Sequence, residues 1–148
     1  MERKPINIML VDDDASDRMV FRDALEELEI LTIIQTQNNG QQLMDYLATN
    51  IAHLPNIIFL DLNMPRKNGL ECLKEIRSNE RFKAISIIIY STSASENDIN
   101  ETFLNGANAY IKKPNNFNLL KQVLDKAVTT INLYQDTALN RENFLLKL

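Results

Sequence analysis

Acidic residues at two separate places in the chain could hold a metal ion together. Asp12 and Asp13 directly follow the apolar run Ile6–Val11, and Asp61 directly follows the apolar run 56–60. Carboxylates that lie close together repel one another, so their pKa values rise unless a cation offsets the repulsion. Mg²⁺ prefers such oxygen ligands, keeps several waters and often binds a phosphate as well. We therefore expect a site for a divalent cation and a phosphoryl group.

A hydroxyl group and an ammonium group stand at the ends of two further apolar runs. Ser91 follows residues 85–90, and its hydroxyl can rotate to donate a hydrogen bond to a newly added anion. Lys113 stands just beyond residues 109–111. Its compact positive charge can pair with a phosphoryl oxygen, or with Asp61 when no phosphoryl group is present. Both side chains could therefore act on a phosphoryl group at the carboxylates.

These places are all ends of predicted β-strands. Short apolar runs at 6–11, 31–36, 56–60, 85–90 and 109–111 alternate with longer amphipathic stretches, which is the pattern of strands separated by crossover helices. Most runs are apolar on both faces, as a parallel sheet covered by helices requires. The clearest helical period is in the last stretch, at Phe117, Leu120, Val123, Leu124, Ala127, Val128 and Ile131. We predict an α/β fold with a doubly wound, five-stranded parallel sheet flanked by five helices, whose ligands bind beyond the carboxyl ends of the strands.

Each of these residues also has an ordinary structural explanation. An acidic run after a strand is about as often only a helix N-terminus, whose dipole favours negative charge, and Asp14 or Ser16 would cap that helix. Ser91 could belong to a turn, and the pair Lys113-Pro114 could be a surface loop. The coincidence of all these residue types at four strand ends favours the functional explanation.

The composition is that of an ordinary globular domain. The chain has 148 residues, of which 45% are hydrophobic and 24% are charged, and this length usually makes one domain. A formal net charge of −4 argues against a surface that tracks a nucleic-acid backbone. The single cysteine, Cys72, cannot form an internal disulfide, and the first apolar run is too short for a signal peptide or a membrane span. We expect a cytoplasmic protein that binds neither nucleic acid nor membrane.

Four motifs resemble those of a known family. The segments MLVDDD, LDLNMPRKNG, IIIYST and YIKKP are similar in type and spacing to the receiver domain of two-component response regulators, such as chemotaxis regulators, from about residue 6 to about residue 132. The resemblance implies a flavodoxin-like sheet with the strand order 2-1-3-4-5. Asp61 would take a phosphoryl group from a phosphohistidine. Mg²⁺, or Mn²⁺ in its place, would be bound by Asp12, Asp13, Asp61 and the backbone carbonyl of Asn63.

The resemblance also implies roles for residues around the phosphoryl group. Lys113 would pair with it, and Ser91 and Tyr110 would form a switch that couples it to a distant face. That face lies on the fourth helix, the fifth strand and the fifth helix. Asn63 and Ser93 would influence the lifetime of the phosphoryl group.

A finer likeness concerns partners and domain limits. The stretch 78–84 and the pair Asp98-Ile99 resemble small stand-alone receivers that serve phytochrome-type histidine kinases, so we expect such a sensor kinase, or a phosphotransfer protein, as the phosphodonor. We assign residues 1–133 to the receiver domain and 134–148 to a tail that extends the last helix or packs on another surface, with no output domain. The output would be a contact with a downstream protein, and the apolar tail leaves a homodimer open.

Two other functions fit parts of this pattern. A phosphatase of the haloacid-dehalogenase type also uses an aspartate nucleophile, but it needs an Asp-x-Asp pair, and Asn63 stands where the second aspartate would be the general acid. A pseudo-receiver that works only as a binding module is disfavoured because every reactive position is present, namely Asp12, Asp13, Asp61, Ser91 and Lys113. We therefore expect no enzyme, apart from self-phosphorylation and self-dephosphorylation.

Overall fold

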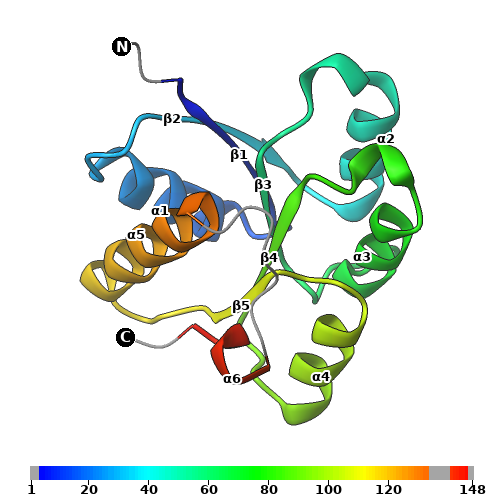
Figure 1. Cartoon of the computed structure of the whole chain (residues 1–148). Helices are drawn as coiled ribbons and strands as arrows, with labels where there is room; N and C mark the ends of the chain where they lie inside the picture. The colour runs from blue at the N-terminus through cyan, green and yellow to red at the C-terminus, as the bar shows by residue number, and fades with distance from the viewer. Residues whose placement is uncertain (1–3, 134–140, 147–148) are drawn as a thin grey trace.

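The fold is built on one parallel sheet. The computed structural model describes residues 4–133 and 141–146. Within them, five parallel strands lie in the order β2-β1-β3-β4-β5, which confirms the predicted α/β fold and its strand order (Figure 1). The strands are β1 (Ile6–Val11), β2 (Thr32–Gln37), β3 (Ile57–Leu60), β4 (Ser86–Ser91) and β5 (Ala109–Lys112).

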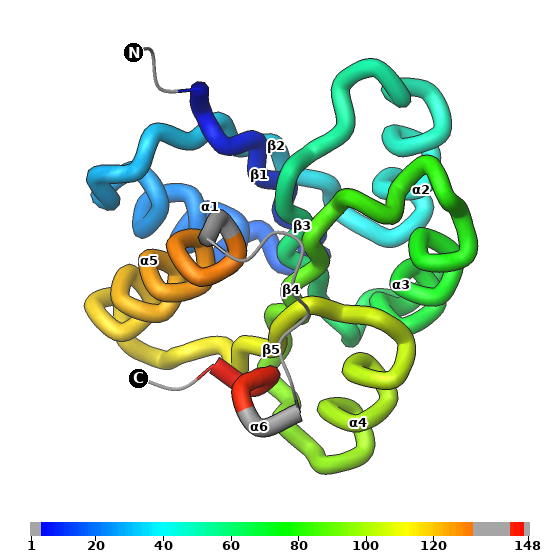
Figure 2. Tube along the Cα trace, viewed as in Figure 1, coloured from blue at the N-terminus to red at the C-terminus, as the bar shows by residue number. Residues whose placement is uncertain are grey.

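Helices cover both faces of the sheet. Helices α1 and α5 lie on one face, and α2, α3 and α4 lie on the other (Figure 1 and Figure 2). Right-handed crossovers between parallel strands produce this doubly wound arrangement. The helices are α1 (Ala15–Glu26), α2 (Gly40–Thr49), α3 (Gly69–Arg77), α4 (Glu96–Leu104), α5 (Phe117–Leu133) and α6 (Arg141–Phe144), with the 3-10 helices η1 (Ile51–His53) and η2 (Glu80–Phe82).

Two cores follow from the alternation of side chains along each strand. In β1, Met9 and Val11 point to the core that α2, α3 and α4 cover, whereas Ile8 and Leu10 point to the core that α1 and α5 cover. Strand β2 differs because it lies at an edge of the sheet, and Ile33 on it is 49% exposed. The inner strands are therefore covered on both faces as predicted, and β2 is not.

The helix after β1 begins at an acidic residue. Asp14 is the N-cap of α1, and its carboxylate accepts a hydrogen bond from the backbone N–H of Asp17 at 2.9 Å. Such a cap satisfies a backbone donor that the helix itself leaves without a partner. Of the two predicted caps, Asp14 and Ser16, the structure therefore selects Asp14. The first turn of α1 is thereby fixed close to the carboxyl end of β1.

The described part of the C-terminal tail packs on the open edge of the sheet. Phe144 in α6 is fully buried, and its ring meets those of Phe103 and Tyr110 at centroid distances of 5.2 and 6.2 Å. The Leu146 N–H donates to the Tyr110 carbonyl at 2.9 Å, and Leu145 forms a parallel bridge with Tyr110. These contacts cover backbone groups that an edge strand would otherwise expose. Residues 134–140 lie outside the described residues, and a dimer formed through the tail stays a prediction.

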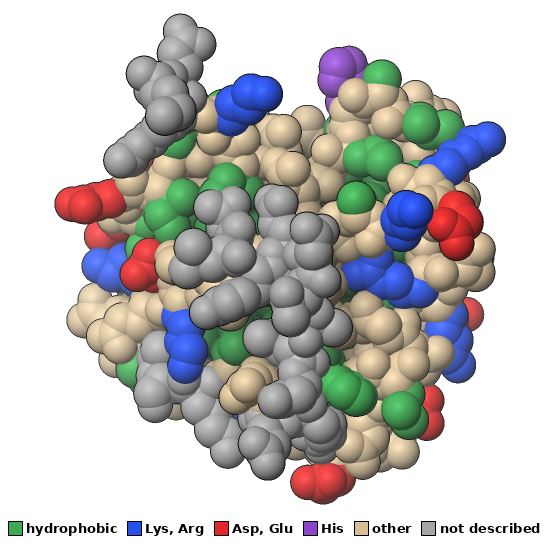
Figure 3. Space-filling view, in the orientation of Figure 1, with side chains coloured by type: hydrophobic (Ala, Val, Ile, Leu, Met, Phe, Trp, Pro, Cys, Tyr) green, Lys and Arg blue, Asp and Glu red, His purple; other side chains and the backbone are tan. Residues whose placement is uncertain are grey.

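One face of the molecule shows charged side chains that are spread rather than gathered. On the face shown in Figure 3, Lys and Arg side chains alternate with acidic and neutral ones and do not merge into one basic patch. Nonspecific nucleic-acid binding needs clustered Lys and Arg, and the described residues visible on this face do not form such a cluster. A search of the described residues finds no helix with the length and apolarity of a membrane span.

Removal of the buried aromatic ring of the tail should destabilise the domain. Phe144→Ala deletes a fully buried side chain, and such a truncation lowers the free energy of unfolding by about 3 kcal/mol. Leu104→Ala is the matched control, because Leu104 on α4 is 77% exposed and its removal should change stability by less than about 0.5 kcal/mol. Urea unfolding followed by circular dichroism measures both variants. A Phe144→Ala variant as stable as the wild type would show that the tail is not packed on β5 in solution.

Candidate phosphoryl and metal site

Three carboxylates meet at the carboxyl ends of β1 and β3. The two strands are neighbours, with Val11 paired to Leu60, so the residues that follow them also lie side by side. The N–H of Asp61 donates to the Val11 carbonyl at 3.0 Å, which ties Asp61 to β1. One carboxylate oxygen from each of Asp12, Asp13 and Asp61 lies within 4.8 Å of the other two. The structure thus brings together the three predicted metal-binding side chains.

This set of oxygen atoms fits a hard divalent cation. Asp12 and Asp61 are buried, with exposed fractions of 0% and 4%, whereas Asp13 is exposed. The Lys113 ammonium lies 2.8 Å from Asp12 Oδ2 and 3.8 Å from Asp61 Oδ2, so one lysine is shared by two buried carboxylates and leaves room for a further positive charge. A few carboxylates leave space around an octahedral ion for waters and a phosphate oxygen. Mg²⁺ or an ion of similar preference suits this site.

Burial also governs the charge of Asp61. It raises the pKa of the Asp61 carboxyl to about 6 from an ordinary value of 3.8. The Lys113 ammonium opposes this rise, and the charges of Asp12 and Asp13 add to it. Burial raises the pKa of Asp12 as well. A bound cation would lower the pKa of both groups, because it favours the ionised carboxylate.

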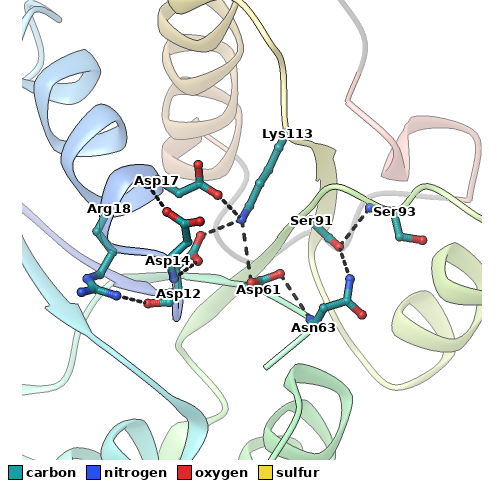
Figure 4. A network of polar contacts seen from close by, with 9 residues as sticks. All are labelled: Asp12, Asp14, Asp17, Arg18, Asp61, Asn63, Ser91, Ser93 and Lys113. Atoms are coloured by element: carbon teal, nitrogen blue, oxygen red, sulfur yellow. Dashed lines mark hydrogen bonds and ion pairs between the residues drawn. The ribbon is translucent and has the colours of Figure 1, made fainter. Parts of the chain in front are cut away.

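Lys113 reaches the carboxylates from the end of β5. Its backbone N–H donates to the Ser91 carbonyl at 2.8 Å, which fixes this loop beside the end of β4. Its ammonium nitrogen lies 2.8 Å from Asp12 Oδ2 and 3.8 Å from Asp61 Oδ2, and its side chain is 9% exposed (Figure 4). Burial alone would lower the pKa of this ammonium, but the surrounding carboxylates hold it above the usual lysine value. Lys113 is therefore charged and stands beside Asp61.

Ser91 and Asn63 stand on the side of Asp61 away from α1 (Figure 4). The Ser91 hydroxyl accepts hydrogen bonds from the Ser93 N–H at 3.2 Å and from the Asn63 side-chain amide at 3.5 Å. The Asn63 N–H donates to Asp61 Oδ1 at 3.3 Å, so Asn63 links the two residues. The Ser93 hydroxyl instead donates to Asp98 Oδ2 at 2.7 Å. The side chain of Ser93 is thus engaged with α4 and not with Asp61.

Tyr110 connects the surroundings of the site with the tail. Its side chain is fully buried, and its hydroxyl donates to the Ser93 carbonyl at 2.7 Å. Burial raises the pKa of this phenol to about 12, so the hydroxyl remains a donor at neutral pH. The same ring meets that of Phe144. The predicted switch residue therefore contacts both the loop after β4 and the C-terminal tail.

The loop from Asp61 to α3 turns back closely on itself. The Gly69 N–H donates to the Leu62 carbonyl at 3.1 Å, and a Cβ atom at Gly69 would lie 2.2 Å from the Asp61 carbonyl oxygen. No side chain fits at that distance, so only glycine is compatible with this approach. Arg66 in the same loop has a φ of 68°, a left-handed conformation that is uncommon outside glycine. The loop thus holds the backbone of Asp61 in one conformation.

Two residues of α1, Asp17 and Arg18, also contact the site, although neither belongs to the predicted set of site residues. Asp17 Oδ2 lies 2.8 Å from the Lys113 ammonium, and the Arg18 guanidinium donates to the Asp12 carbonyl at 2.7 Å. Both belong to the first turns after the N-cap, at the sheet edge where ligands bind in such folds. That position is the available sequence signal. It is weak, because helix dipoles also favour acidic residues there.

Comparison with known proteins places the chain in a family. The family model described as response regulator receiver domain matches residues 8–125. The probable methanogenesis regulatory protein FilR2 of Methanothrix harundinacea is 32% identical over 125 residues, which cover 82% of this chain and 81% of FilR2. The response regulator Rcp1 of Synechocystis is 32% identical over 124 residues, which cover 80% of this chain and 84% of Rcp1.

Solved structures agree with this relation. The phosphorylated cyanobacterial phytochrome response regulator RcpA superposes with a TM-score of 0.78 and 32% identity, over 93% of this chain and 100% of that chain. The Mn²⁺-bound form of Rcp1 superposes with a TM-score of 0.76 and 28% identity, over 92% of this chain and 100% of that chain. The chain therefore belongs to the response regulator receiver family of two-component signalling. The predicted likeness to receivers associated with phytochromes is also confirmed.

Replacement of Asp61 by asparagine should stabilise the metal-free protein above the pKa of Asp61. The pKa is about 6 in the folded protein and 3.8 ordinarily, so the folded state binds more protons between these values. The contribution of protonated Asp61 to the free energy of unfolding is therefore present at low pH and is lost as the pH rises through about 6. Asp61→Asn avoids this loss, and it should unfold with a free energy higher by about 2 kcal/mol at about pH 8.

Urea unfolding of the metal-free variants at two pH values measures this effect. The difference should nearly vanish at about pH 4, and Mg²⁺ should reduce it at about pH 8, because the cation stabilises ionised Asp61 in the wild type. Asp23→Asn, an exposed aspartate of α1, is the control with the same change of charge. A gain from Asp61→Asn that is equal at both pH values would contradict the assignment.

Proposed function

We propose that this protein is a phosphoacceptor that takes a phosphoryl group on Asp61 and passes the signal on through a protein contact. The observation that supports it most directly is the surrounding of Asp61. This buried carboxylate lies within 4.8 Å of two others and 3.8 Å from the Lys113 ammonium. Phosphoryl transfer depends on alignment and on neutralisation of the equatorial oxygens far more than on a strong base. The site offers both.

The chemistry follows from these groups. An Asp61 carboxylate oxygen attacks the phosphorus of a phosphohistidine, the P–N bond breaks, and the imidazole nitrogen takes a proton. The product is an aspartyl phosphate, a covalent intermediate of the kind that carboxylates form in reversible steps. Mg²⁺, or Mn²⁺, held by Asp12, Asp13, Asp61 and the Asn63 carbonyl, would supply charge for the phosphoryl oxygens when bound. Lys113 supplies a further positive charge, and the Ser91 hydroxyl rotates to donate a hydrogen bond.

The signal would leave the site through Ser91 and Tyr110. When the Ser91 hydroxyl turns to the phosphoryl group, it gives up its bonds with Ser93 and Asn63. Tyr110 is bonded to the Ser93 carbonyl, so it feels a movement of the loop after β4. A phosphoryl group shifts an existing equilibrium if it contacts one conformation better than the other. The readout face would comprise α4, β5 and α5.

The residues that set the phosphate lifetime would be Asn63 and Ser93. Asn63 is exposed; its backbone N–H donates to Asp61 and its side-chain amide donates to Ser91, so its side chain would lie beside the approach of an attacking water. Ser93 would act less directly, because its hydroxyl is bonded to Asp98. The absence of a carboxylic acid at position 63 also leaves the phosphatase alternative without a general acid.

The phosphodonor would be a sensor histidine kinase of the phytochrome type, or a phosphotransfer protein. Support comes from two structural relatives: RcpA is a cyanobacterial phytochrome response regulator, and AtBRR is a bacteriophytochrome response regulator. AtBRR is 25% identical to this chain with a TM-score of 0.72, over 93% of this chain and 99% of that chain. This chain shares their fold over nearly its whole described length.

A small phosphodonor tests the proposed function. Wild-type protein incubated with acetyl phosphate and Mg²⁺ should gain one phosphoryl group by mass spectrometry, and Asp61→Asn should gain none, because an amide is no nucleophile for phosphorus. Asp23→Asn on α1 should label like the wild type, since Asp23 is not one of the clustered carboxylates. Equal labelling of wild type and Asp61→Asn would defeat the assignment of the phosphoacceptor.

The class of kinase can be tested separately. Radiolabelled phosphohistidine on a phytochrome-type kinase should reach Asp61 at least about tenfold faster than phosphohistidine on a chemotaxis-type kinase, because partner choice rests on complementary contacts worth about 1.4 kcal/mol per factor of ten. Transfer rates measured by rapid quenching at equal kinase concentrations give the ratio. A ratio near one, or a preference for the chemotaxis-type kinase, would rule out the phytochrome-type partner while leaving Asp61 as the acceptor.

A further inference from the structure

The hydrogen bonds of Lys113 point to a residue outside the four motifs. Its ammonium has three N–H donors and three carboxylates within 4 Å. The 2.8 Å contact with Asp17 Oδ2 is a hydrogen bond. The contact with Asp12 Oδ2 is an equally short ion pair, so Lys113 is held by Asp12 and Asp17 together. Asp61 stands further away, at 3.8 Å. Of the two carboxylates at 2.8 Å, Asp17 is the one that lies outside the cluster of Asp12, Asp13 and Asp61.

Asp17 also differs from the other two carboxylates in its place. Asp12 and Asp61 belong to the cluster that fits a cation, and Asp17 does not. A cation held by Asp12 would compete with the lysine for that carboxylate, whereas Asp17 would stay with the lysine. Asp17 lies on α1 and holds the ammonium from that side of the site (Figure 4). Its side chain is 39% exposed, whereas that of Lys113 is 9% exposed.

The distance between the Lys113 ammonium and the Asp61 carboxylate affects how Asp61 can take a phosphoryl group. At 3.8 Å the ammonium nitrogen is too far from Asp61 Oδ2 to donate a hydrogen bond. The attacking oxygen therefore keeps its lone pairs, and an oxygen of the incoming phosphoryl group meets an N–H that is already near. Without Asp17, and with Asp12 engaged by a cation, the charge of Asp61 would draw the ammonium onto the nucleophile. The lysine would then occupy the space of the incoming group, and misplacement by about 1 Å can slow a reaction about a hundredfold.

We propose that Asp17 is a positioning residue that holds Lys113 beside Asp61 but not against it, so that the lysine meets the incoming phosphoryl group. This inference rests on the proposed function of Asp61 and adds a residue from the helix that follows β1. It explains why a carboxylate of α1 hydrogen-bonds a lysine 96 positions away in the chain.

The test compares the rates at which acetyl phosphate with Mg²⁺ labels variants of the full chain. Asp17→Ala should label roughly tenfold more slowly than the wild type, and Asp17→Asn should lose less, because its amide oxygen still accepts a hydrogen bond. Glu27→Gln is the matched control. Glu27, the C-cap of α1, pairs with Lys121 at 3.2 Å and so links the end of α1 to α5, as Asp17 links α1 to the end of β5, but outside the site. It should label at the wild-type rate.

Two further measurements separate positioning from a structural role. In a Lys113→Ala background, the additional change Asp17→Ala should have no effect on the labelling rate, because a residue that acts through the lysine has nothing left to act on. Titration calorimetry with Mg²⁺ alone should give dissociation constants for Asp17→Ala and the wild type within about threefold, as for a partly exposed charge outside the ligand set.

Several results would overturn the proposal. They are wild-type labelling by Asp17→Ala, an equal loss in Glu27→Gln, a further loss in the Lys113→Ala background, or a large loss of Mg²⁺ affinity that would make Asp17 a metal ligand. In each of these cases the wild type would still be labelled on Asp61. If the wild type itself takes no phosphoryl group, the proposed function fails instead, so the two failures are distinguishable.

Discussion

Lys113 places a positive charge where water hardly reaches, and buried carboxylates surround it. The lysine is 9% exposed, and Asp12 and Asp61 are buried. Removal of such charges from water costs several kcal/mol for each ion unless opposite charges lie close. Here the balance is uneven, because Asp13 and Asp17 add negative charge that one lysine does not offset. Burial, together with the charges of Asp12 and Asp13, raises the pKa of Asp61. A divalent cation relieves the repulsion, and the other features of the domain serve to keep these charges in place.

The parallel sheet provides that restraint because its strands end at one edge. The Asp61 N–H is bonded to Val11 at the end of β1, and the Lys113 N–H is bonded to Ser91 at the end of β4. Neither backbone can move away without breaking a hydrogen bond of the ladder. Gly69 adds a steric condition, since a side chain there would strike the Asp61 carbonyl. Charged groups that would separate in a flexible chain are thus held within a few ångströms by backbone hydrogen bonds and close packing.

The sequence predicts this arrangement as far as short-range patterns reach. The bounds of β1 are as predicted, and those of the other strands differ by no more than one residue, because alternation and turn residues mark strand ends directly. The resemblance of four motifs supplied the strand order. The hydrogen bond from Lys113 to Asp17 was not predictable in this way, since it depends on the orientation of α1 relative to a loop 96 residues later. The position of Phe144 was not predictable for a similar reason, because an apolar tail can pack on more than one part of the domain surface.

Tyr110 shows how the site and the edge of the sheet are joined. Its hydroxyl donates a hydrogen bond to the carbonyl of Ser93. The backbone N–H of Ser93 in turn donates to the Ser91 hydroxyl. Its ring meets that of Phe144, and its carbonyl accepts the N–H of Leu146. The ring cannot change its position without altering its contact with Phe144 or losing its bond to the loop after β4. A rearrangement of Ser91 that displaces this loop therefore acts on a packed element with few alternative positions, and packed elements of this kind change in discrete steps rather than gradually.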